Sequence, residues 1–224
     1  MRLNKFIARA TGKSRREADD LIASGRVRIN GKVADLGAQI SEPITAKISL
    51  DYKLLSLPSQ RTLIMLNKPI GYVSSRRAQA ENAKTLYELL PPEFRQLKTV
   101  GRLDQDSSGL ILLTDDGDFA FQMTHPKFAK TKIYLVQIDK PLAPLHQQMI
   151  SDFGINLPDG KSRMTLERMD DERRDWIVTM HEGRNRQIRR TFAAVGYTVQ
   201  KLHRTDFGNY SLENLKLGKY RVLE

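Results

Sequence analysis

The sequence contains no cysteine, and this absence limits the kinds of site that the protein can build. Without thiols, disulfides and thiolate metal sites are excluded, and the composition fits a reducing cytoplasm. Apolar stretches are short, since none approaches the roughly 20 residues of a membrane-spanning helix. The N-terminus lacks the apolar core of a signal peptide, and there is no internal repeat or low-complexity tract. We therefore expect a cytoplasmic protein that does not associate with a membrane.

Acidic residues are also few relative to basic ones. The chain has 224 residues with 37 Lys and Arg against 26 Asp and Glu, a formal net charge of +11. Most of the excess lies in two segments, residues 1–40 with nine cations against four acids and residues 181–204 with six against one. A chain that contacts a charged backbone at two places would need this clustering, so nucleic acid is the first candidate partner.

The length and the 40% hydrophobic content allow one large domain or two smaller ones. Apolar residues recur at helical spacing after Leu3, and Ser14 followed by Glu17 predicts a capping box for a second helix. Asn30-Gly31 lies between alternating apolar residues and predicts a hairpin. We expect a first domain over residues 1–48 and a linker over residues 49–60.

Residues 61–224 are expected to form a second domain of α+β class, because strands and helices follow one another without a regular βαβ rhythm. Apolar runs predict strands over residues 133–138 and 176–180, short helical segments are expected over 85–90 and 184–195, and residues 74–84 are expected to form a mobile loop. The fold expected for this part of the chain is a mixed, mostly antiparallel sheet flanked by helices.

The most informative stretch is the loop Gly101-Arg102-Leu103-Asp104-Gln105-Asp106-Ser107-Ser108-Gly109, which precedes the apolar run over residues 110–113. It holds the carboxylate of Asp104 near the guanidinium of Arg102 in a polar loop. The segment that anchors this loop must be buried. A charged pair held against a core strand is typical of a functional site.

The N-terminal segment resembles the S4 RNA-binding domain. The matching elements are Arg2-Leu3-Asn4-Lys5-Phe6-Ile7, then Ser14-Arg15-Arg16-Glu17-Ala18, then the stretch from Gly25 to Lys32, which ends in Asn30-Gly31-Lys32. The resemblance implies that a basic helix and the adjacent loop follow RNA phosphates. Arg15, Arg16 and Lys32 are the contacts that it implies here.

The rest of the chain resembles the RsuA family of pseudouridine synthases. The motifs that carry this resemblance follow one another in order: Leu66-Asn67-Lys68-Pro69-Ile70-Gly71, Gly101-Arg102-Leu103-Asp104, residues 109–117, Lys132-Ile133-Tyr134-Leu135-Val136, and Glu182-Gly183-Arg184-Asn185-Arg186-Gln187-Ile188-Arg189-Arg190 with Lys201-Leu202-His203-Arg204 after it. Together with the S4 elements, they cover nearly the whole chain. The resemblance implies isomerisation of a uridine in ribosomal RNA, free or in a pre-ribosomal particle, by a monomer without a cofactor or a metal.

The resemblance also implies roles for single residues. Asp104 would be the nucleophile, with Arg189 paired to it so that the carboxylate stays ionised. Tyr134 would stack on the uracil, and whether it also transfers a proton stays open; a strand tyrosine is more often a core residue. Leu202 would close the apolar side of the site, and Arg102 would enter the space that the flipped base vacates.

Three further cations are expected to bind the substrate, namely Lys68, Arg184 and Arg186. Lys68 would contact RNA or support the site structurally, and the two arginines would contact phosphates or be solvated. The choice of Arg189 among the arginines of its helix rests on motif alignment alone. The sequence gives no role to Asp106. Features of the third motif are similar to enzymes that act on large-subunit RNA, whereas the length is similar to the small-subunit enzyme, so the target stays open.

Parts of the sequence also fit two other functions. Asp104 with Asp106, and Asp115-Asp116 with Asp118, could hold magnesium in a nuclease, although Arg102 would repel a cation there. The basic segments alone would equally fit a non-catalytic RNA-binding or ribosome-assembly protein, which would not need a strand-anchored carboxylate and tyrosine.

Overall fold

The computed structural model describes residues 1–41, 44–58, 60–76 and 83–223. The predicted mobile loop over residues 74–84 lies partly outside these ranges, since 77–82 are not described. The chain divides into two compact units, Met1–Thr62 with Asp115–Gly117, and Leu63–Thr114 with Asp118–Glu224. The described helices include none long and apolar enough to cross a membrane.

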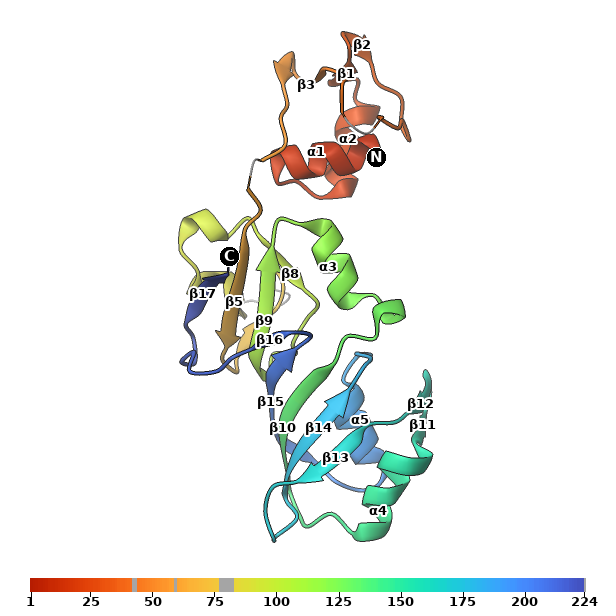
Figure 1. The fold of residues 1–224 in the computed structure, drawn as a ribbon, viewed down its shortest axis with the longest axis vertical. Helices are drawn as coiled ribbons and strands as arrows, with labels where there is room; N and C mark the ends of the chain where they lie inside the picture. Colours follow the sequence, from red (N-terminus) through yellow and green to blue (C-terminus); the bar gives the residue numbers. More distant parts are fainter. Residues whose placement is uncertain (42–43, 59, 77–82, 224) are drawn as a thin grey trace. The chain divides into compact units, whose positions relative to one another are not determined.

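The first unit packs two helices against a four-stranded sheet (Figure 1). Its elements are α1 (Leu3–Thr11), α2 (Arg15–Ala23), β1 (Val27–Ile29), β2 (Lys32–Val33), β3 (Ile48–Leu50) and β4 (Lys53–Leu54), and the strand order is β2-β1-β3-β4. The helices bury the apolar positions that recur at helical spacing, among them Phe6, Ile7 and Ile22, and these join Val27 and Ile48 in one core. The amphipathic pattern of the sequence therefore determines which face of each helix meets the sheet.

Local sequence signals in this unit are confirmed. The Ser14 hydroxyl accepts a hydrogen bond from the Glu17 amide at 3.2 Å, and the Glu17 carboxylate accepts one from the Ser14 amide at 2.7 Å, which completes the predicted capping box. Asn30 and Gly31 both have positive φ, 50° and 84°, as a two-residue hairpin between β1 and β2 requires.

The predicted linker is wrong over its first part. Residues 49–54 belong to β3 and β4 and to the turn between them, and β3 pairs with β1. Asp51 and Tyr52 both have positive φ, 48° and 64°, at this turn. Because neither is glycine and the strands are only three and two residues long, composition gives a weak signal for this hairpin.

The second unit is built on a nine-stranded sheet, as counted over the described residues. The order is β13-β14-β10-β15-β9-β5-β17, with β8 and β16 paired to β9 and β15. The strands are β5 (Leu63–Lys68), β8 (Lys98–Val100), β9 (Ser108–Thr114), β10 (Lys132–Ile138), β13 (Thr165–Arg168), β14 (Asp175–Met180), β15 (Val199–Phe207), β16 (Tyr210–Ser211) and β17 (Tyr220–Leu223). Its recorded pairings are antiparallel except β9 with β15, so the predicted mixed, mostly antiparallel sheet is confirmed.

Smaller elements complete this unit. The short strand pairs are β6 (Tyr72–Val73) with β7 (Lys84–Thr85) and β11 (Ile155–Leu157) with β12 (Gly160–Ser162). The helical segments are η1 (Leu86–Leu89), η2 (Pro92–Phe94), α3 (Gly117–Thr124), η3 (Pro126–Phe128), α4 (Pro144–Gln148), η4 (Met149–Phe153) and α5 (Gln187–Ala194). Figure 1 shows α4 and α5 beside the β13-β14-β10 half of the sheet.

Strand β9 lies inside the sheet, between β15 and β5, and has apolar side chains on both faces. Ile111 and Leu113 enter the larger core, whereas Leu110 and Leu112 enter a second core on the opposite face. All four are fully buried, which confirms the expectation from the apolar run after the Asp104 loop. That loop is therefore attached to one of the most rigidly packed strands of the unit.

Gly109 allows β9 and β15 to approach each other at the start of their parallel pairing. Its φ is +111°, and a Cβ placed there would lie 2.2 Å from the Arg204 carbonyl oxygen. No side chain can be accommodated at that distance from backbone. The glycine that closes the Asp104 loop is thus needed for the junction between the two strands that carry the site.

Helix α5 is shorter than predicted. The sequence indicated a helix over residues 184–195, but the helix begins at Gln187, because Arg186 is left-handed with φ 47°. The segment predicted as a helix over 85–90 is the single-turn η1. The residues before Gln187 instead form a loop that lines the cavity described next.

Candidate active site

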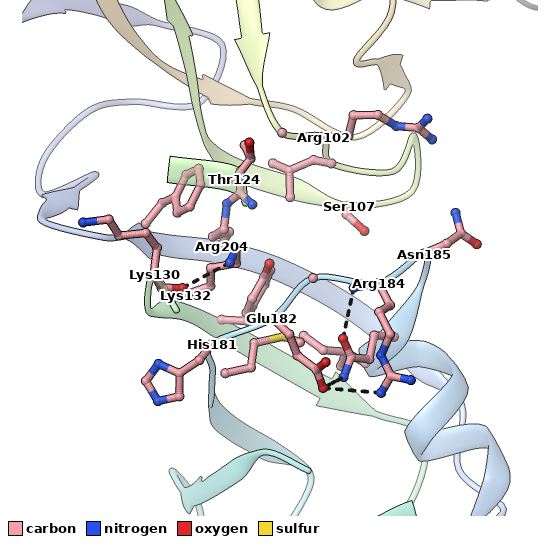
Figure 2. Close-up of a pocket in the computed structure, with 18 of the residues that line it drawn as sticks. Arg102, Ser107, Thr124, Lys130, Lys132, His181, Glu182, Arg184, Asn185 and Arg204 are labelled. Carbon is pink, nitrogen blue, oxygen red and sulfur yellow. Dashed lines mark hydrogen bonds and ion pairs between the residues drawn. The ribbon is translucent and has the colours of Figure 1, made fainter. Parts of the chain in front are cut away.

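A cavity of about 590 Å³ opens beside the Asp104 loop. This volume lies in the range of about 300–1,000 Å³ that is usual for small-ligand sites. Its wall is formed by the Asp104 loop, the end of α3, strands β10 and β15, and the loop over residues 181–186 (Figure 2). Six of the predicted site residues line it: Arg102, Asp104, Tyr134, Arg184, Arg186 and Leu202.

The Asp104 carboxylate is held at a turn that leaves it partly open to solvent. The Ser107 amide donates to the Asp104 carbonyl at 3.1 Å, and the neighbouring Leu103 is buried. The Asp104 side chain is 24% exposed. A carboxylate in this position stays partly hydrated and can also contact a ligand inside the cavity.

Tyr134 and Leu202 lie on adjacent strands and face the same cavity. In the pairing of β10 with β15, Tyr134 is opposite Arg204 and the next inward residue of β10, Val136, is opposite Leu202. Both side chains are 7% exposed, although they line the cavity. They form an apolar and aromatic wall opposite the polar loop, an arrangement suited to a planar, partly polar ligand.

The predicted pair between Arg189 and Asp104 is wrong. Arg189 Nε lies 3.3 Å from Asp106 Oδ2, an ion pair without hydrogen-bond alignment, and its Nη2 donates to the Asp106 carbonyl at 2.8 Å. Its Nη1 donates to the Val199 carbonyl at 2.7 Å. The guanidinium therefore fixes the Asp104 loop through Asp106 and joins it to the start of β15.

The ion pair to Asp104 comes from Arg186, which the sequence had placed among the RNA contacts. Arg186 Nη1 lies 3.6 Å from Asp104 Oδ2. The same guanidinium donates to both Asp106 oxygens, at 3.0 and 2.8 Å. Asp106 thus holds Arg186 in a two-pronged geometry and leaves it just outside hydrogen-bond distance of Asp104.

The charges in this cluster support one another. The hydrogen bonds from Arg186 are the main cause that lowers the pKa of Asp106, and the charges of Arg189 and Arg186 act in the same direction, while burial opposes them. The pKa of Arg186 is raised mainly by its hydrogen bonds to Asp106. Asp106 is therefore a permanent anion that keeps two guanidinium groups beside the Asp104 loop.

Lys68 supports the loop entrance and does not line the cavity. Its side chain is fully buried at the end of β5, and Nζ donates to the carbonyls of Pro69 and Tyr72, at 3.0 and 2.8 Å. Burial lowers the pKa of Lys68 to about 8, while the carboxylates of Asp104 and Asp106 act in the opposite direction. Of the two roles left open by the sequence, these contacts favour structural support.

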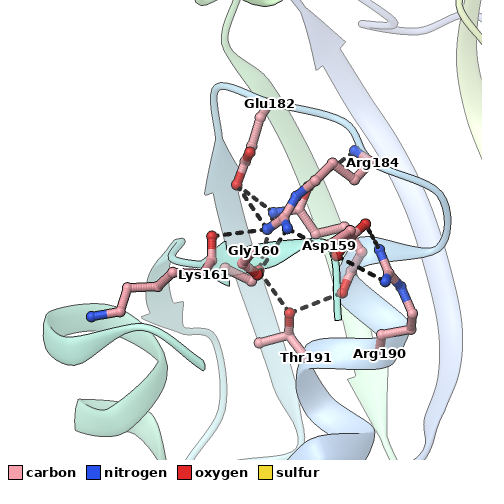
Figure 3. Close-up of polar contacts among 9 residues, drawn as sticks. Asp159, Gly160, Lys161, Glu182, Arg184, Arg190 and Thr191 are labelled. Atoms are coloured by element: carbon pink, nitrogen blue, oxygen red, sulfur yellow. Dashed lines mark hydrogen bonds and ion pairs between the residues drawn. The ribbon is translucent and has the colours of Figure 1, made fainter. Parts of the chain in front are cut away.

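Arg184 lines the cavity, but its guanidinium is occupied by other parts of the chain (Figure 3). It donates to Asp159 Oδ1, the Gly160 carbonyl and the Lys161 carbonyl, each at 2.9 Å, and to Glu182 Oε1 at 3.3 Å. Four acceptors leave little capacity for a phosphate. Arg184 therefore links the loop over residues 181–186 to the hairpin of β11 and β12.

A buried polar chain continues from this link into α5. Gln187 donates from Nε2 to Glu182 and to the Ser162 hydroxyl, at 2.5 and 3.0 Å, and accepts from the Arg184 amide at 3.1 Å. The Thr191 hydroxyl donates to Ser162 at 2.8 Å. Because these side chains are hydrogen-bonded to one another and largely buried, the network gives the cavity wall one defined conformation.

Comparison with known proteins agrees with this arrangement. Residues 62–194 match the RNA pseudouridylate synthase family, and residues 1–42 match the S4 domain. The chain belongs to the RNA pseudouridylate synthase family. The enzymes of this family are isomerases, so a purely non-catalytic RNA-binding protein is not the best description of the chain.

Relatives of this pseudouridylate synthase cover its whole length. Ribosomal large subunit pseudouridine synthase B of Bacillus subtilis (strain 168) is 34% identical, with 99% of this chain and 91% of the relative covered. Ribosomal small subunit pseudouridine synthase A of Pasteurella multocida (strain Pm70) is 38% identical, with 100% and 96% covered. A crystal structure of a pseudouridylate synthase is 35% identical with a TM-score of 0.70, and covers 100% of this chain and 96% of its own. These matches confirm the resemblance to the RsuA family.

In the S4 unit of this pseudouridylate synthase, the predicted RNA contacts are exposed. Arg15 and Arg16 lie in the first turn of α2, and Lys32 follows the hairpin turn. Arg15 donates to the Asn4 side chain at 3.2 Å, which orients it on the surface. Exposed cations at these positions are compatible with phosphate contacts.

Several residues of the cavity were not assigned a role from the sequence. Lys132 and Arg204 line the cavity and are buried, at 9% and 2% exposed. Each lies two residues from a predicted site residue, Tyr134 or Leu202, so the period of two along a strand could have placed both in the site. Charge works against this signal, because charged side chains are usually expected on the solvent face.

The acids of the alternative magnesium site have other partners. Asp104 and Asp106 are paired with arginine, Asp115 Oδ1 accepts from the Thr62 amide at 3.0 Å, and Asp116 is paired with Arg61. Over the described part of the chain, no group of three or more His, Asp or Glu side chains is placed to hold a metal ion.

Proposed function

We propose that this chain converts a specific uridine of ribosomal RNA to pseudouridine, with Asp104 as the nucleophile. The observation that carries the proposal is the placement of Asp104, Tyr134 and Leu202 around one cavity in a chain of the pseudouridylate synthase family. Ribosomal RNA is proposed because the printed names of relatives with full-length coverage specify ribosomal subunits. Both subunits are named among them, so the RNA of either can be the substrate.

The chemistry requires no redox partner and no group donor. The bond between ribose C1′ and base N1 breaks, a bond between C1′ and C5 forms, C5 loses a proton and N1 gains one, so substrate and product have the same composition. What the protein must supply is a nucleophile, a place for the flipped base and protection from water. We therefore propose a reaction without a cofactor.

The residues of the cavity can each contribute to this reaction. Asp104 supplies the carboxylate, and the guanidinium of Arg186 lies 3.6 Å from it. Tyr134 stacks on the uracil, a contact worth roughly 1–3 kcal/mol per base, and Leu202 closes the apolar side. Arg102 is exposed at the cavity and takes no part in the ion-pair network that holds Arg186, so it can enter the space that the flipped base vacates.

The decisive experiment is site-mapped pseudouridine profiling of ribosomal RNA from cells with and without this protein. We expect one position to lose its pseudouridine and to regain it when the wild-type chain is supplied. Asp104→Asn should bind the RNA with nearly wild-type affinity and form no product. Pseudouridine formation by Asp104→Asn would show that Asp104 is not the nucleophile, and an unchanged profile in cells without the protein would refute the ribosomal substrate.

A further inference from the structure

Two buried cations lie side by side at the base of the cavity. Lys132 belongs to β10 and Arg204 to β15, and both line the cavity that contains Asp104 (Figure 2). They contact the same aromatic ring, since Lys132 Nζ lies 5.2 Å and Arg204 Cζ 4.8 Å from the centroid of Phe207. Neither has been given a role in the reaction proposed above.

Their hydrogen bonds leave donors unused. Arg204 Nε donates to the Leu110 carbonyl at 2.8 Å, but its Nη2 is buried and has no hydrogen-bond partner among the residues that the structure describes. Lys132 Nζ donates to the Lys130 carbonyl at 3.1 Å. Among the described residues, neither cation has a carboxylate within ion-pair distance. A buried cation without an anion is costly, so this arrangement indicates a partner that arrives from outside the chain.

The carboxylates of the cavity do not supply that partner. Asp104 lies by Arg186, and Glu182 accepts from Arg184 and Gln187. Six cations line the cavity against these two carboxylates. Burial and the nearby charge of Arg204 lower the pKa of Lys132 to about 8, although Glu182 acts in the opposite direction. The cavity is therefore positively charged at neutral pH.

We propose that Lys132 and Arg204 bind a phosphate group of the flipped nucleotide and thereby position its ribose for Asp104. This inference rests on the proposed function, because it assumes that a uridine nucleotide occupies the cavity. A phosphate is favoured over a base carbonyl because it alone brings the negative charge that two buried cations lack. Its oxygens can also accept from donors of the two cations that the chain leaves unused.

Two separate contacts would hold the substrate in the cavity. A phosphate fixed at β10 and β15, together with a base stacked on Tyr134, would fix the nucleotide at two points. The ribose between them would then be presented to the carboxylate in one orientation, which is the kind of positioning that raises a rate without new chemistry. Lys132 and Arg204 are accordingly binding and positioning residues.

The test compares the binding of uridine with that of uridine 5′-monophosphate and uridine 3′-monophosphate to the full chain, by calorimetry or equilibrium dialysis at pH 7. We expect wild type to prefer one of the monophosphates over uridine by at least about 10-fold, the equivalent of one buried charge-assisted contact. Arg204→Gln and Lys132→Met should each reduce this preference to less than about threefold while changing uridine affinity little.

The matched control is Arg221→Gln, which also removes one cation. Arg221 lies on β17 and pairs with Glu213 at 3.0 Å, outside the cavity. It should keep the wild-type preference. If Arg204→Gln does not fold, as judged by circular dichroism and thermal unfolding, Lys132→Met and Arg204→Lys carry the test, and Arg204→Lys should keep part of the preference.

Three results would overturn the inference: equal binding of uridine and both monophosphates by wild type, a preference that survives both substitutions, or an equal loss of affinity for uridine itself. The last result would place the cations against the base. Because binding needs no turnover, Asp104→Asn should retain the preference. Failure of the RNA profiling with an intact phosphate preference would refute the proposed function alone, and the reverse outcome would refute this inference alone.

Discussion

Asp106 offers the sharpest test of how the Asp104 loop is organised. Its carboxylate accepts both prongs of Arg186, at 3.0 and 2.8 Å, and lies 3.3 Å from Arg189 Nε. Asp106→Asn removes the charge and keeps the shape. In the variant, the nearest carboxylate to Arg186 is Asp104, now 3.6 Å away, so the guanidinium should shift onto the proposed nucleophile.

The expected magnitudes differ for stability and for activity. The Asp106 and Arg186 side chains are 46% and 43% exposed, so solvent screens their pair and its loss should cost about 1 kcal/mol of unfolding free energy. The more buried Arg189 keeps its bonds to two carbonyls. A displacement of about 1 Å near a reacting group can cost about 100-fold in rate, and asparagine retains one acceptor, so we expect kcat to fall by about 10- to 100-fold.

The assay is single-turnover pseudouridine formation at saturating RNA, with urea unfolding as the measure of stability. Asp51→Asn is the matched control, because Asp51 accepts from Arg26 in the same two-pronged way, at 2.9 and 2.5 Å, with similar exposure. It should lose a similar amount of stability and keep its rate. Asp106→Glu should recover part of the rate, since the charge is restored.

A wild-type single-turnover rate for Asp106→Asn would refute this account. So would a loss no greater than that of Asp51→Asn, because the effect would then be general destabilisation. A large rise in the RNA concentration needed for saturation, with an unchanged rate at saturation, would make Asp106 a binding residue instead of one that positions the arginines.

Gly109→Ala should lower the free energy of unfolding in urea by at least about 3 kcal/mol, because a Cβ at this position would lie 2.2 Å from a backbone atom. The control is Gly31→Ala, which also has positive φ but open space around it, and it should cost about 1–2 kcal/mol. Equal costs would contradict the close approach of the two strands. Arg184→Gln should lower the melting temperature and leave the salt dependence of RNA binding unchanged, whereas Arg15→Gln should reduce the slope of log K against log salt by about 1. The pKa of Lys68 is lowered from 10.5 to about 8, so the folded state releases this proton at a lower pH than the unfolded state. The free energy of unfolding should therefore rise between pH 8 and 10.5, by at most about 1.4 kcal/mol per pH unit. Lys68→Met should remove that rise, and an identical dependence of stability on pH for both proteins would contradict the prediction.

Much of the fold follows from local signals in the sequence. The capping box at Ser14, the Asn30-Gly31 turn and the apolar run after Gly109 each act within a few residues, so composition and spacing are sufficient to place them. The short hairpin of β3 and β4 escaped prediction because its turn residues have positive φ without being glycine. Conformations that tertiary packing imposes on ordinary residues leave no clear local signal.

The candidate site shows the same division. The residues that line the cavity from neighbouring strands, such as Tyr134 and Leu202, could be named from motifs whose spacing within the chain is short. The sequence could not predict which arginine faces which carboxylate. Asp104 and Asp106 are two residues apart in a loop, and Arg186 and Arg189 are three residues apart, with the start of helix α5 between them. Because Arg186 has a left-handed backbone conformation, the helix begins only at Gln187, and the two arginines meet other partners than the motif predicts.

The observed pairing gives Asp106 the closer ion pairs, although Asp104 is the proposed nucleophile. A nucleophilic carboxylate that accepted two prongs from an arginine would be ionised but poorly reactive, since both oxygens would be occupied. Placing the tight pair on Asp106 keeps two positive charges next to Asp104 and leaves its oxygens available, with Arg186 at 3.6 Å. The second acid of the loop therefore separates two requirements that a single carboxylate could not meet: a strong anchor for the arginines and an accessible electron pair for the ribose.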